Sequence, residues 1–129
     1  AQGLAALVHE IRQAPIEPEM PVPAILIVCP PPIQSPRGVM AAKFAGAERR
    51  CVGLAEAYSE VANSLCCYFF DAGSVTSSSR VDGVHLDRDQ HLTLGAALAA
   101  VVEPILTTDD RAAISGQEGT GTSATSGRS

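Results

Sequence analysis

Two short apolar runs on either side of a helical pattern constrain the fold of this 129-residue chain most strongly. The first run, residues 24–29, does not alternate with polar residues, which is typical of a strand buried on both faces of a parallel sheet. Three prolines at 30–32 end it, because proline cannot donate to a strand ladder. The second run, 66–70, follows a helical pattern over 41–65. The sequence therefore predicts a right-handed strand-helix-strand unit in one α/β domain.

Three helices are expected, because apolar residues recur every three or four positions in three segments. The first helix spans 2–13. The second spans 41–65, and Gly46 and Gly53 are expected to weaken it only modestly. The third follows Asp87, which forms a capping-box pattern with Gln90. The apolar stripes consist of Leu4, Leu7, Val8 and Ile11 in the first helix, of Phe44, Ala47, Cys51, Leu54, Tyr58, Val61 and Leu65 in the second, and of Leu94, Leu98 and Val101 in the third.

An aspartate and a histidine, Asp82 and His85, lie three positions apart between the second strand and the third helix. In open α/β sheets, ligands and chemistry are placed beyond the carboxyl ends of the strands. An imidazole at that edge can accept a proton near neutral pH if a carboxylate fixes its tautomer. An Asp-x-x-His spacing by itself also arises often by chance. The following helix strengthens the interpretation of Asp82 and His85 as a catalytic pair.

Five other residues could be read as functional, and each has a simpler explanation. Cys29 would lie at the same sheet edge as His85, but a rigid proline run follows it and no helix N-terminus lowers its thiol pKa. Ser74 opens a polar loop and lacks the sharp strand-to-helix turn of a nucleophile. His91 lies one turn inside the third helix, where a structural role is expected. Asp89 is explained by the helix dipole, as is the capping residue Asp87.

Three segments together resemble the last sequence block of the SGNH (GDSL-type) hydrolases, and in particular their bacterial arylesterase/acyltransferase branch. The segments are FFDAG at 69–73, VDGVH at 81–85, and a helix that contains Leu94, Gly95, Ala97, Leu98 and Ala99. The resemblance reaches back through the Cys-Pro-Pro-Pro run at 29–32 and covers most of the chain up to about Ile105. It implies a three-layer α/β/α, flavodoxin-like domain with a parallel sheet. It also implies that Asp82 and His85 are the Asp and His of a Ser-His-Asp triad.

The family's nucleophile motif is missing from this chain. Neither a Gly-Asp-Ser block nor a Gly-x-Asn-Asp block occurs in the sequence. The resemblance therefore implies the C-terminal half of a hydrolase domain, at 1–106, that supplies Asp82 and His85 to ester hydrolysis or acyl transfer but lacks the serine. The alternative is a catalytically inactive homologue that acts as a binding or assembly module. A nucleotide-binding fragment has little support, because no glycine fingerprint follows either strand.

Composition limits the partners that the chain is expected to bind. The net charge is −5 and no basic patch occurs, which disfavours nucleic acid and anionic membrane surfaces. No apolar run is expected to approach the roughly 20 residues of a membrane span. The four cysteines lack zinc-site spacing, so they are interpreted as free thiols, and neither a metal nor a cofactor is expected. The expected partners are a small-molecule ester, the N-terminal half of the domain and a second copy of the chain.

The C-terminal segment at 107–129 changes in composition to serine, threonine and glycine. It holds too few large apolar side chains to offset the entropy of ordering, so a disordered tail is expected. The chain begins with Ala1, and no charged and apolar leader precedes the first helix, which is what either a mature or a truncated chain would show. A cytoplasmic location is the default expectation.

Overall fold

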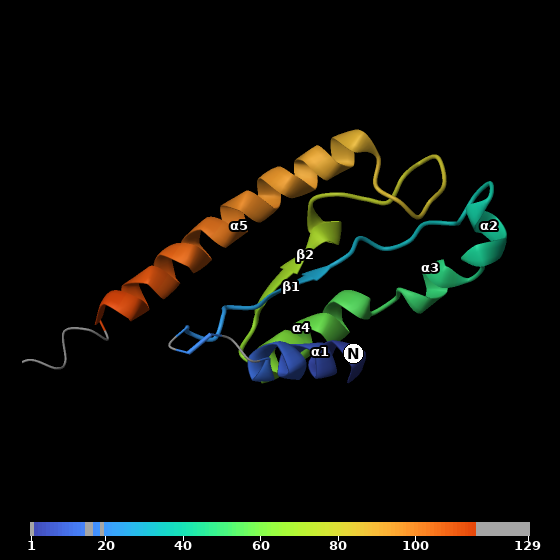
Figure 1. Ribbon diagram of the computed structural model, residues 1–129. Coiled ribbons are helices and arrows are strands. Elements are labelled where there is room, and N and C mark those ends of the chain that lie inside the picture. Colours follow the sequence, from blue (N-terminus) through green and yellow to red (C-terminus); the bar gives the residue numbers. More distant parts are fainter. Residues whose placement is uncertain (1, 15–16, 19, 116–129) are drawn as a thin grey trace, which may run out of the picture.

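The sheet of this protein consists of two parallel strands. The computed structural model describes residues 2–14, 17–18 and 20–115. Strand β1 (Leu26–Cys29) pairs with β2 (Tyr68–Asp71), in a register that places Leu26 opposite Tyr68 and Cys29 opposite Asp71. Both strands end at the same edge of the sheet (Figure 1). The predicted α/β class with a parallel sheet is therefore confirmed, although the strands begin two residues later than expected.

Two helices cover one face of this sheet. Helix α1 (Gln2–Gln13) contacts α4 (Leu54–Ser64), and α4 contacts both strands. The centre of this core is formed by Val8, Ile27 and Ala62, all almost completely buried. Figure 1 shows α1 and α4 together on one side of the strands. Only part of the apolar stripe of α1 is buried in this core, because Leu7 is 61% exposed.

The segment predicted as one long helix is divided into three. Helix α2 (Met40–Lys43) and helix α3 (Ala47–Arg50) precede α4. The breaks fall at Gly46 and Gly53, both of which have φ of +75°. A left-handed backbone cannot be continued within a right-handed helix. The prediction of a single helix over 41–65, and with it the count of three helices, was therefore wrong.

The connection from β2 to the last helix is partly buried, although it is rich in polar residues. It begins with a 3₁₀ turn, η1 (Ala72–Ser74), and then runs in irregular structure to Asp87. Ser78 and Ser79 are 0% and 2% exposed. Burial is compatible with these polar residues because both hydroxyl groups donate hydrogen bonds, to Pro32 and to Asp87 respectively.

Helix α5 (Arg88–Ser115) is longer than the sequence suggested. It continues past Pro104 and includes residues 107–115, which were expected to lack structure. Leu94, Leu98 and Val101 are half-buried, in agreement with the predicted stripe. The rest of the predicted tail, 116–129, lies outside the described residues, so its disorder stays a prediction, as does the domain boundary after residue 106.

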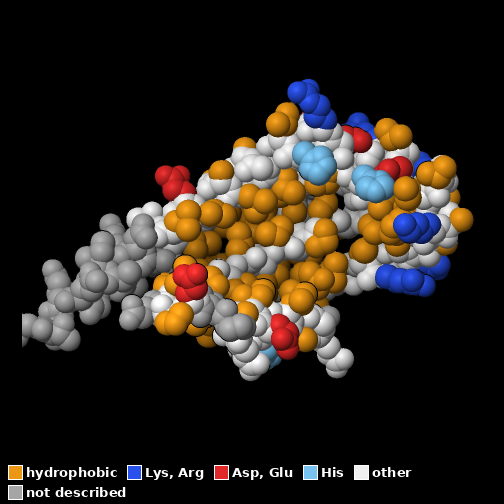
Figure 2. All heavy atoms as spheres, viewed as in Figure 1, with side chains coloured by type: hydrophobic (Ala, Val, Ile, Leu, Met, Phe, Trp, Pro, Cys, Tyr) orange, Lys and Arg blue, Asp and Glu red, His pale blue; other side chains and the backbone are white. Residues whose placement is uncertain are grey.

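Helix α5 is largely exposed and apolar. By length and composition alone, its part Arg88–Thr108 could cross a membrane, and only 6% of this window is buried. The expectation that no apolar run approaches this length was therefore wrong, because the many alanines of this helix contribute to its apolar character. Figure 2 shows hydrophobic side chains gathered over the strands, between α5 and the α1 and α4 pair. Among the described residues, no further layer covers this surface.

Candidate active site

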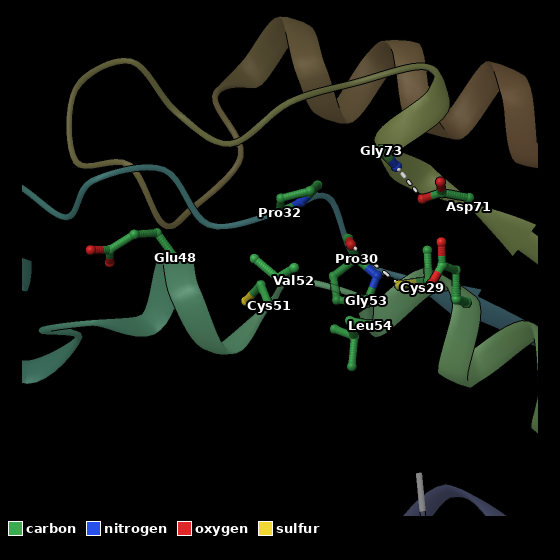
Figure 3. Close-up of a pocket in the computed structure, with 12 residues that line it drawn as sticks. Cys29, Pro30, Pro32, Glu48, Cys51, Val52, Gly53, Leu54, Asp71 and Gly73 are labelled. Atoms are coloured by element: carbon green, nitrogen blue, oxygen red, sulfur yellow. Dashed lines mark hydrogen bonds between the residues drawn. The ribbon is translucent and has the colours of Figure 1, made fainter.

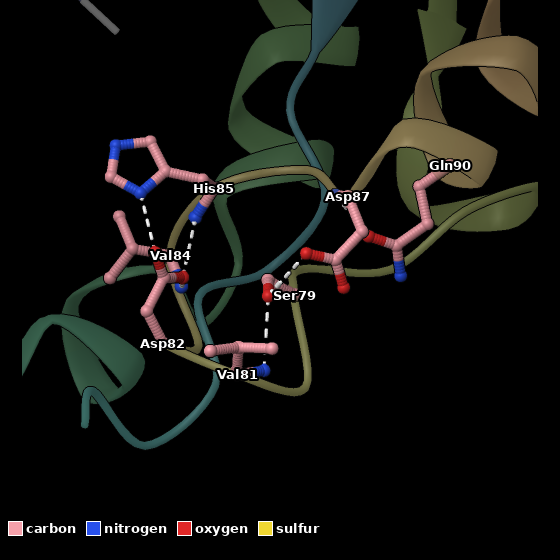
Figure 4. A network of polar contacts seen from close by, with 7 residues as sticks. All are labelled: Ser79, Val81, Asp82, Val84, His85, Asp87 and Gln90. Atoms are coloured by element: carbon pink, nitrogen blue, oxygen red, sulfur yellow. Dashed lines mark hydrogen bonds and ion pairs between the residues drawn. The ribbon is translucent and has the colours of Figure 1, made fainter. Parts of the chain in front are cut away.

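Asp82 and His85 lie in contact in the loop before α5. Oδ2 of Asp82 is 2.7 Å from Nδ1 of His85. The other carboxylate oxygen, Oδ1, accepts backbone N–H groups from Val84 (2.8 Å) and His85 (3.0 Å). The second ring nitrogen of His85, Nε2, points away from the carboxylate (Figure 4). The structure thus brings together the two residues that the sequence singled out.

The electrostatics of the pair favour an ionised carboxylate. The hydrogen bond from His85, together with those from the two backbone N–H groups, lowers the pKa of Asp82 from 3.8 to about 2. An ionised Asp82 is only an acceptor, so the Nδ1 atom of His85 must carry the proton of their shared bond. Nε2 of a neutral His85 is then left as an acceptor. The arrangement can take a proton from a group placed near Nε2.

The segment that follows β1 holds this loop in place. The backbone N–H of Arg37 donates to the carbonyl of Asp82 (2.9 Å), and that of Gln34 donates to the carbonyl of Gly83 (2.8 Å). Gly83 has φ of +79°, and a Cβ atom at this position would lie 2.6 Å from the carbonyl oxygen of Ser35. Only glycine fits between these two segments. The glycine of the Asp-Gly step is therefore required by a close approach of the backbone.

An apolar cavity adjoins the imidazole of His85. It has a volume of 410 Å³, and its lining includes Val84, His85, Leu86, Pro30 and Leu94. The His85 side chain is 60% exposed, whereas that of Asp82 is 26% exposed. A ligand in this cavity would meet apolar walls on several sides and the imidazole on one. Such a lining suits a small, mostly apolar molecule.

Cys29 lies beside a different cavity. That cavity has a volume of 310 Å³, and its lining includes Cys29, Cys51, Asp71 and Gly73 (Figure 3) but not His85. The Cys29 side chain is 1% exposed, and its thiol donates to the carbonyl of Pro30 over 3.6 Å. Burial, followed by the negative charge of Asp71, raises the pKa of the thiol. A protonated, buried thiol is a poor nucleophile, which agrees with the low rank given to Cys29 from the sequence.

The other candidates have structural partners. The Ser74 hydroxyl donates to the carbonyl of Asp71 over 2.6 Å, as expected of a turn residue. His91 is exposed on α5. The backbone N–H of Asp87 donates to Oε1 of Gln90 (2.8 Å), which is one half of the predicted capping box. The Asp87 carboxylate instead accepts the hydroxyl of Ser79 (2.7 Å), a contact that no spacing in the sequence indicated.

No group of three or more His, Cys, Asp or Glu side chains that could hold a metal ion occurs in the described part of the chain. The described cysteines Cys29, Cys51, Cys66 and Cys67 are all free thiols.

Comparison with known proteins identifies close structural relatives. No protein-family model matches the sequence, and no curated protein matches it. Among solved structures, a carbohydrate acetylesterase family member from Sinorhizobium meliloti is 39% identical over 82% of this chain, with a TM-score of 0.76. The native M. smegmatis aryl esterase is 35% identical over 80% of this chain, with a TM-score of 0.72. A putative arylesterase from Agrobacterium tumefaciens is 37% identical over 81%, with a TM-score of 0.68.

The present chain spans only about half of these relatives. It covers 51% of the Sinorhizobium meliloti chain, 49% of the M. smegmatis chain and 50% of the Agrobacterium tumefaciens chain. This coverage agrees with the expectation of a C-terminal half of the domain, which was drawn from the resemblance to the family's last sequence block and from the missing Gly-Asp-Ser block. The chain belongs to the family of SGNH-type aryl esterases and carbohydrate acetylesterases.

Proposed function

We propose that this chain supplies the aspartate and the histidine of a Ser-His-Asp ester hydrolase. The observation that carries the proposal is the 2.7 Å contact between Asp82 Oδ2 and His85 Nδ1, with Nε2 turned away from the carboxylate. This is the orientation in which a histidine of a catalytic triad acts as general base. The similarity to aryl and carbohydrate esterases supports the same reaction class.

The reaction would proceed in two stages. In the first, Nε2 of His85 accepts the proton of a serine hydroxyl as the serine oxygen attacks the ester carbonyl, and the resulting imidazolium is stabilised by the Asp82 carboxylate. His85 then donates that proton to the departing alcohol, which leaves an acyl-enzyme. In the second stage, His85 activates a water molecule, or an alcohol in acyl transfer, to release the acyl group. The serine and the oxyanion donors would come from outside this chain, since its sequence holds no Gly-Asp-Ser block.

The substrate would be a small ester with an apolar acyl or aryl part. The cavity next to His85 has a volume of 410 Å³, and its lining is mostly proline and aliphatic side chains. An apolar group bound there would be removed from water by the cavity walls. The ester carbonyl would then lie toward the imidazole at the mouth of the cavity.

The partner would be a polypeptide that completes the domain. This chain covers about half of its solved relatives, and the missing half would have to supply the nucleophile. It would also cover the free edge of β1 and the apolar surface between α5 and the α1 and α4 pair (Figure 2). Exposed strand edges and apolar surfaces of this kind favour association.

The experiment is a reconstitution with a relative. The chain is co-expressed with the half of the Sinorhizobium meliloti carbohydrate acetylesterase that it does not match, and hydrolysis of p-nitrophenyl acetate is measured. We expect turnover, and a loss on the order of 10³-fold or more in kcat for His85→Ala, because the serine then lacks its general base. The matched control is His91→Ala, which changes an exposed histidine on α5 and should leave the rate unchanged. A reconstituted enzyme that His85→Ala leaves fully active would contradict the proposal.

A second candidate function is a binding or assembly module without catalysis. The observation that favours it is the exposed apolar surface of α5. Only 6% of the apolar window in Arg88–Thr108 is buried. The same reconstitution separates the two functions. A stable complex of the two halves with no turnover above the His85→Ala variant would favour assembly over catalysis.

A further inference from the structure

We propose that Ser79 is a positioning residue that holds the Asp82–His85 pair against the start of α5. This inference rests on the proposed function, because it concerns the same pair. Ser79 is 2% exposed, although it lies in a loop rich in polar residues. Burial of a polar side chain is stable only where its hydrogen-bonding groups are satisfied. Each polar group of Ser79 is satisfied by an atom of the loop or of Asp87.

The backbone of Ser79 closes the loop on itself. Its N–H donates to the carbonyl of His85 over 2.6 Å, and its carbonyl accepts the N–H of Gly83 over 2.9 Å. These two bonds hold the backbone at Gly83, next to Asp82, and at His85 itself. The imidazole of His85 does not bond to Ser79, and the hydroxyl of Ser79 bonds to Asp87 and Val81 instead. Ser79 therefore acts on the pair through the backbone and is not the nucleophile.

The hydroxyl of Ser79 ties the closed loop to the helix. It donates to Oδ1 of Asp87 over 2.7 Å and accepts the N–H of Val81 over 3.0 Å (Figure 4). Asp87 is itself fixed, because its N–H donates to Oε1 of Gln90 (2.8 Å). The amide of Gln90 in turn donates to the hydroxyl of Ser77 (3.1 Å). The two ends of the loop are thus linked through the first turn of α5.

Ser78 provides a matched control in the neighbouring position. It is 0% exposed, and its hydroxyl donates to the carbonyl of Pro32 over 2.7 Å. That bond joins the loop to the segment after β1 and not to Asp87. Replacing either serine with alanine removes one buried hydroxyl of the same size. A difference between the two variants therefore reports the specific role of Ser79 and not the general cost of losing a buried hydrogen bond.

The readout is the tautomer of His85, which depends on the hydrogen bond between its Nδ1 atom and Asp82. The full chain is labelled with ¹⁵N, and the imidazole nitrogen resonances are recorded at pH 8, with His85→Ala used to assign the signals. A free neutral imidazole favours the Nε2–H tautomer, whereas donation to the Asp82 carboxylate requires Nδ1–H. We expect the Nδ1–H form in the wild type and in Ser78→Ala. We expect Ser79→Ala to lose the Nδ1–H form and to shift toward Nε2–H.

A second variant guards against failure of Ser79→Ala to fold. Asp87→Ala removes the acceptor of the Ser79 hydroxyl at a half-buried position, and it should shift the tautomer in the same direction. Far-UV circular dichroism establishes that each variant is folded. Folded Ser79→Ala and Asp87→Ala variants that keep the Nδ1–H form would overturn the positioning role while leaving the proposed reaction intact. A wild type without the Nδ1–H form would overturn the pair itself.

Discussion

At the scale of single residues, three hydrogen bonds to Asp82 define the candidate site. Nδ1 of His85 binds one carboxylate oxygen, and the backbone N–H groups of Val84 and His85 bind the other. A carboxylate held by several donors is stabilised in its charged form. The pKa of Asp82 is lowered to about 2, so this carboxylate is ionised near neutral pH. Its role as a catalytic residue stays a prediction.

The lowered pKa of Asp82 predicts how stability depends on pH. The folded-state pKa of about 2 lies below the ordinary 3.8, so between these values the unfolded chain binds more protons than the folded chain. The contribution of Asp82 is fully present above pH 4 and is lost as the pH falls toward 2. We expect Asp82→Asn to flatten the fall in the free energy of unfolding between pH 5 and pH 2, measured by urea denaturation.

The control for this measurement is Asp89→Asn, which removes an exposed carboxylate from the first turn of α5 without touching the Asp82–His85 pair. The fall in the free energy of unfolding that Asp82→Asn is expected to flatten should persist in this variant, because the Asp82–His85 pair is intact. An Asp82→Asn variant with an unchanged pH dependence would show that the pair contributes nothing to folding.

At the scale of elements, two glycines decide where the helices of the crossover begin. Gly46 precedes α3 and Gly53 precedes α4, each with φ of +75°. Sequence reasoning treated both as weak points within a continuous helix, because the apolar stripe continues across them with helical spacing. Spacing reports which residues face the core and says nothing of the sign of φ at a glycine. The breaks therefore could not be predicted from the pattern of apolar residues.

Two glycine substitutions should have opposite effects on stability. Gly53→Ala forces a Cβ atom into the left-handed region, at a cost of about 1 kcal/mol. Gly95→Ala, in the right-handed helix α5 where a Cβ atom meets open space, should raise stability by about 1 kcal/mol. Urea unfolding followed by circular dichroism measures both changes. If Gly53→Ala stabilised the protein as Gly95→Ala does, residues 41–65 would form a continuous helix after all.

At the scale of the whole molecule, the sheet is incomplete. It contains two strands in the described part of the chain, and the edge of β1 that faces away from β2 has no partner strand there. Val28 in β1 is 37% exposed and Tyr68 in β2 is 42% exposed. An apolar strand with a free edge favours association with another chain. We expect the chain by itself to aggregate or to form dimers, unless a completing half is present.

Charge introduced on the sheet should reduce this self-association. Val28→Lys places a cation on the exposed apolar side of β1, which opposes pairing with another apolar surface. We expect a larger monomeric fraction, measured by size-exclusion chromatography with light scattering. The matched control is Val39→Lys at the start of α2, where the side chain is already 88% exposed. If the two variants had the same monomeric fraction, the surface of self-association would lie elsewhere than on the sheet.

The sequence by itself determined the features that depend on local patterns. The apolar runs specified two parallel strands, the helical stripe specified the first helix, and the Asp-x-x-His spacing specified a pair that the structure brings into contact. These features follow from contacts between residues that are near in sequence or from one face of one element. The resemblance carried by 69–73 and 81–85 likewise needed no structure.

Only the tertiary structure decided the features that depend on segments distant in sequence. The burial of Ser78 depends on the carbonyl of Pro32, 46 residues earlier, and the close approach at Gly83 depends on the backbone of Ser35 from the segment after β1. Helix α5 also continues past Pro104, whereas the composition of residues 107–129 predicted disorder from residue 107 onward. A hydroxyl group is buried only where the fold brings a hydrogen-bond partner to it, and the spacing of residues in the sequence does not reveal that partner.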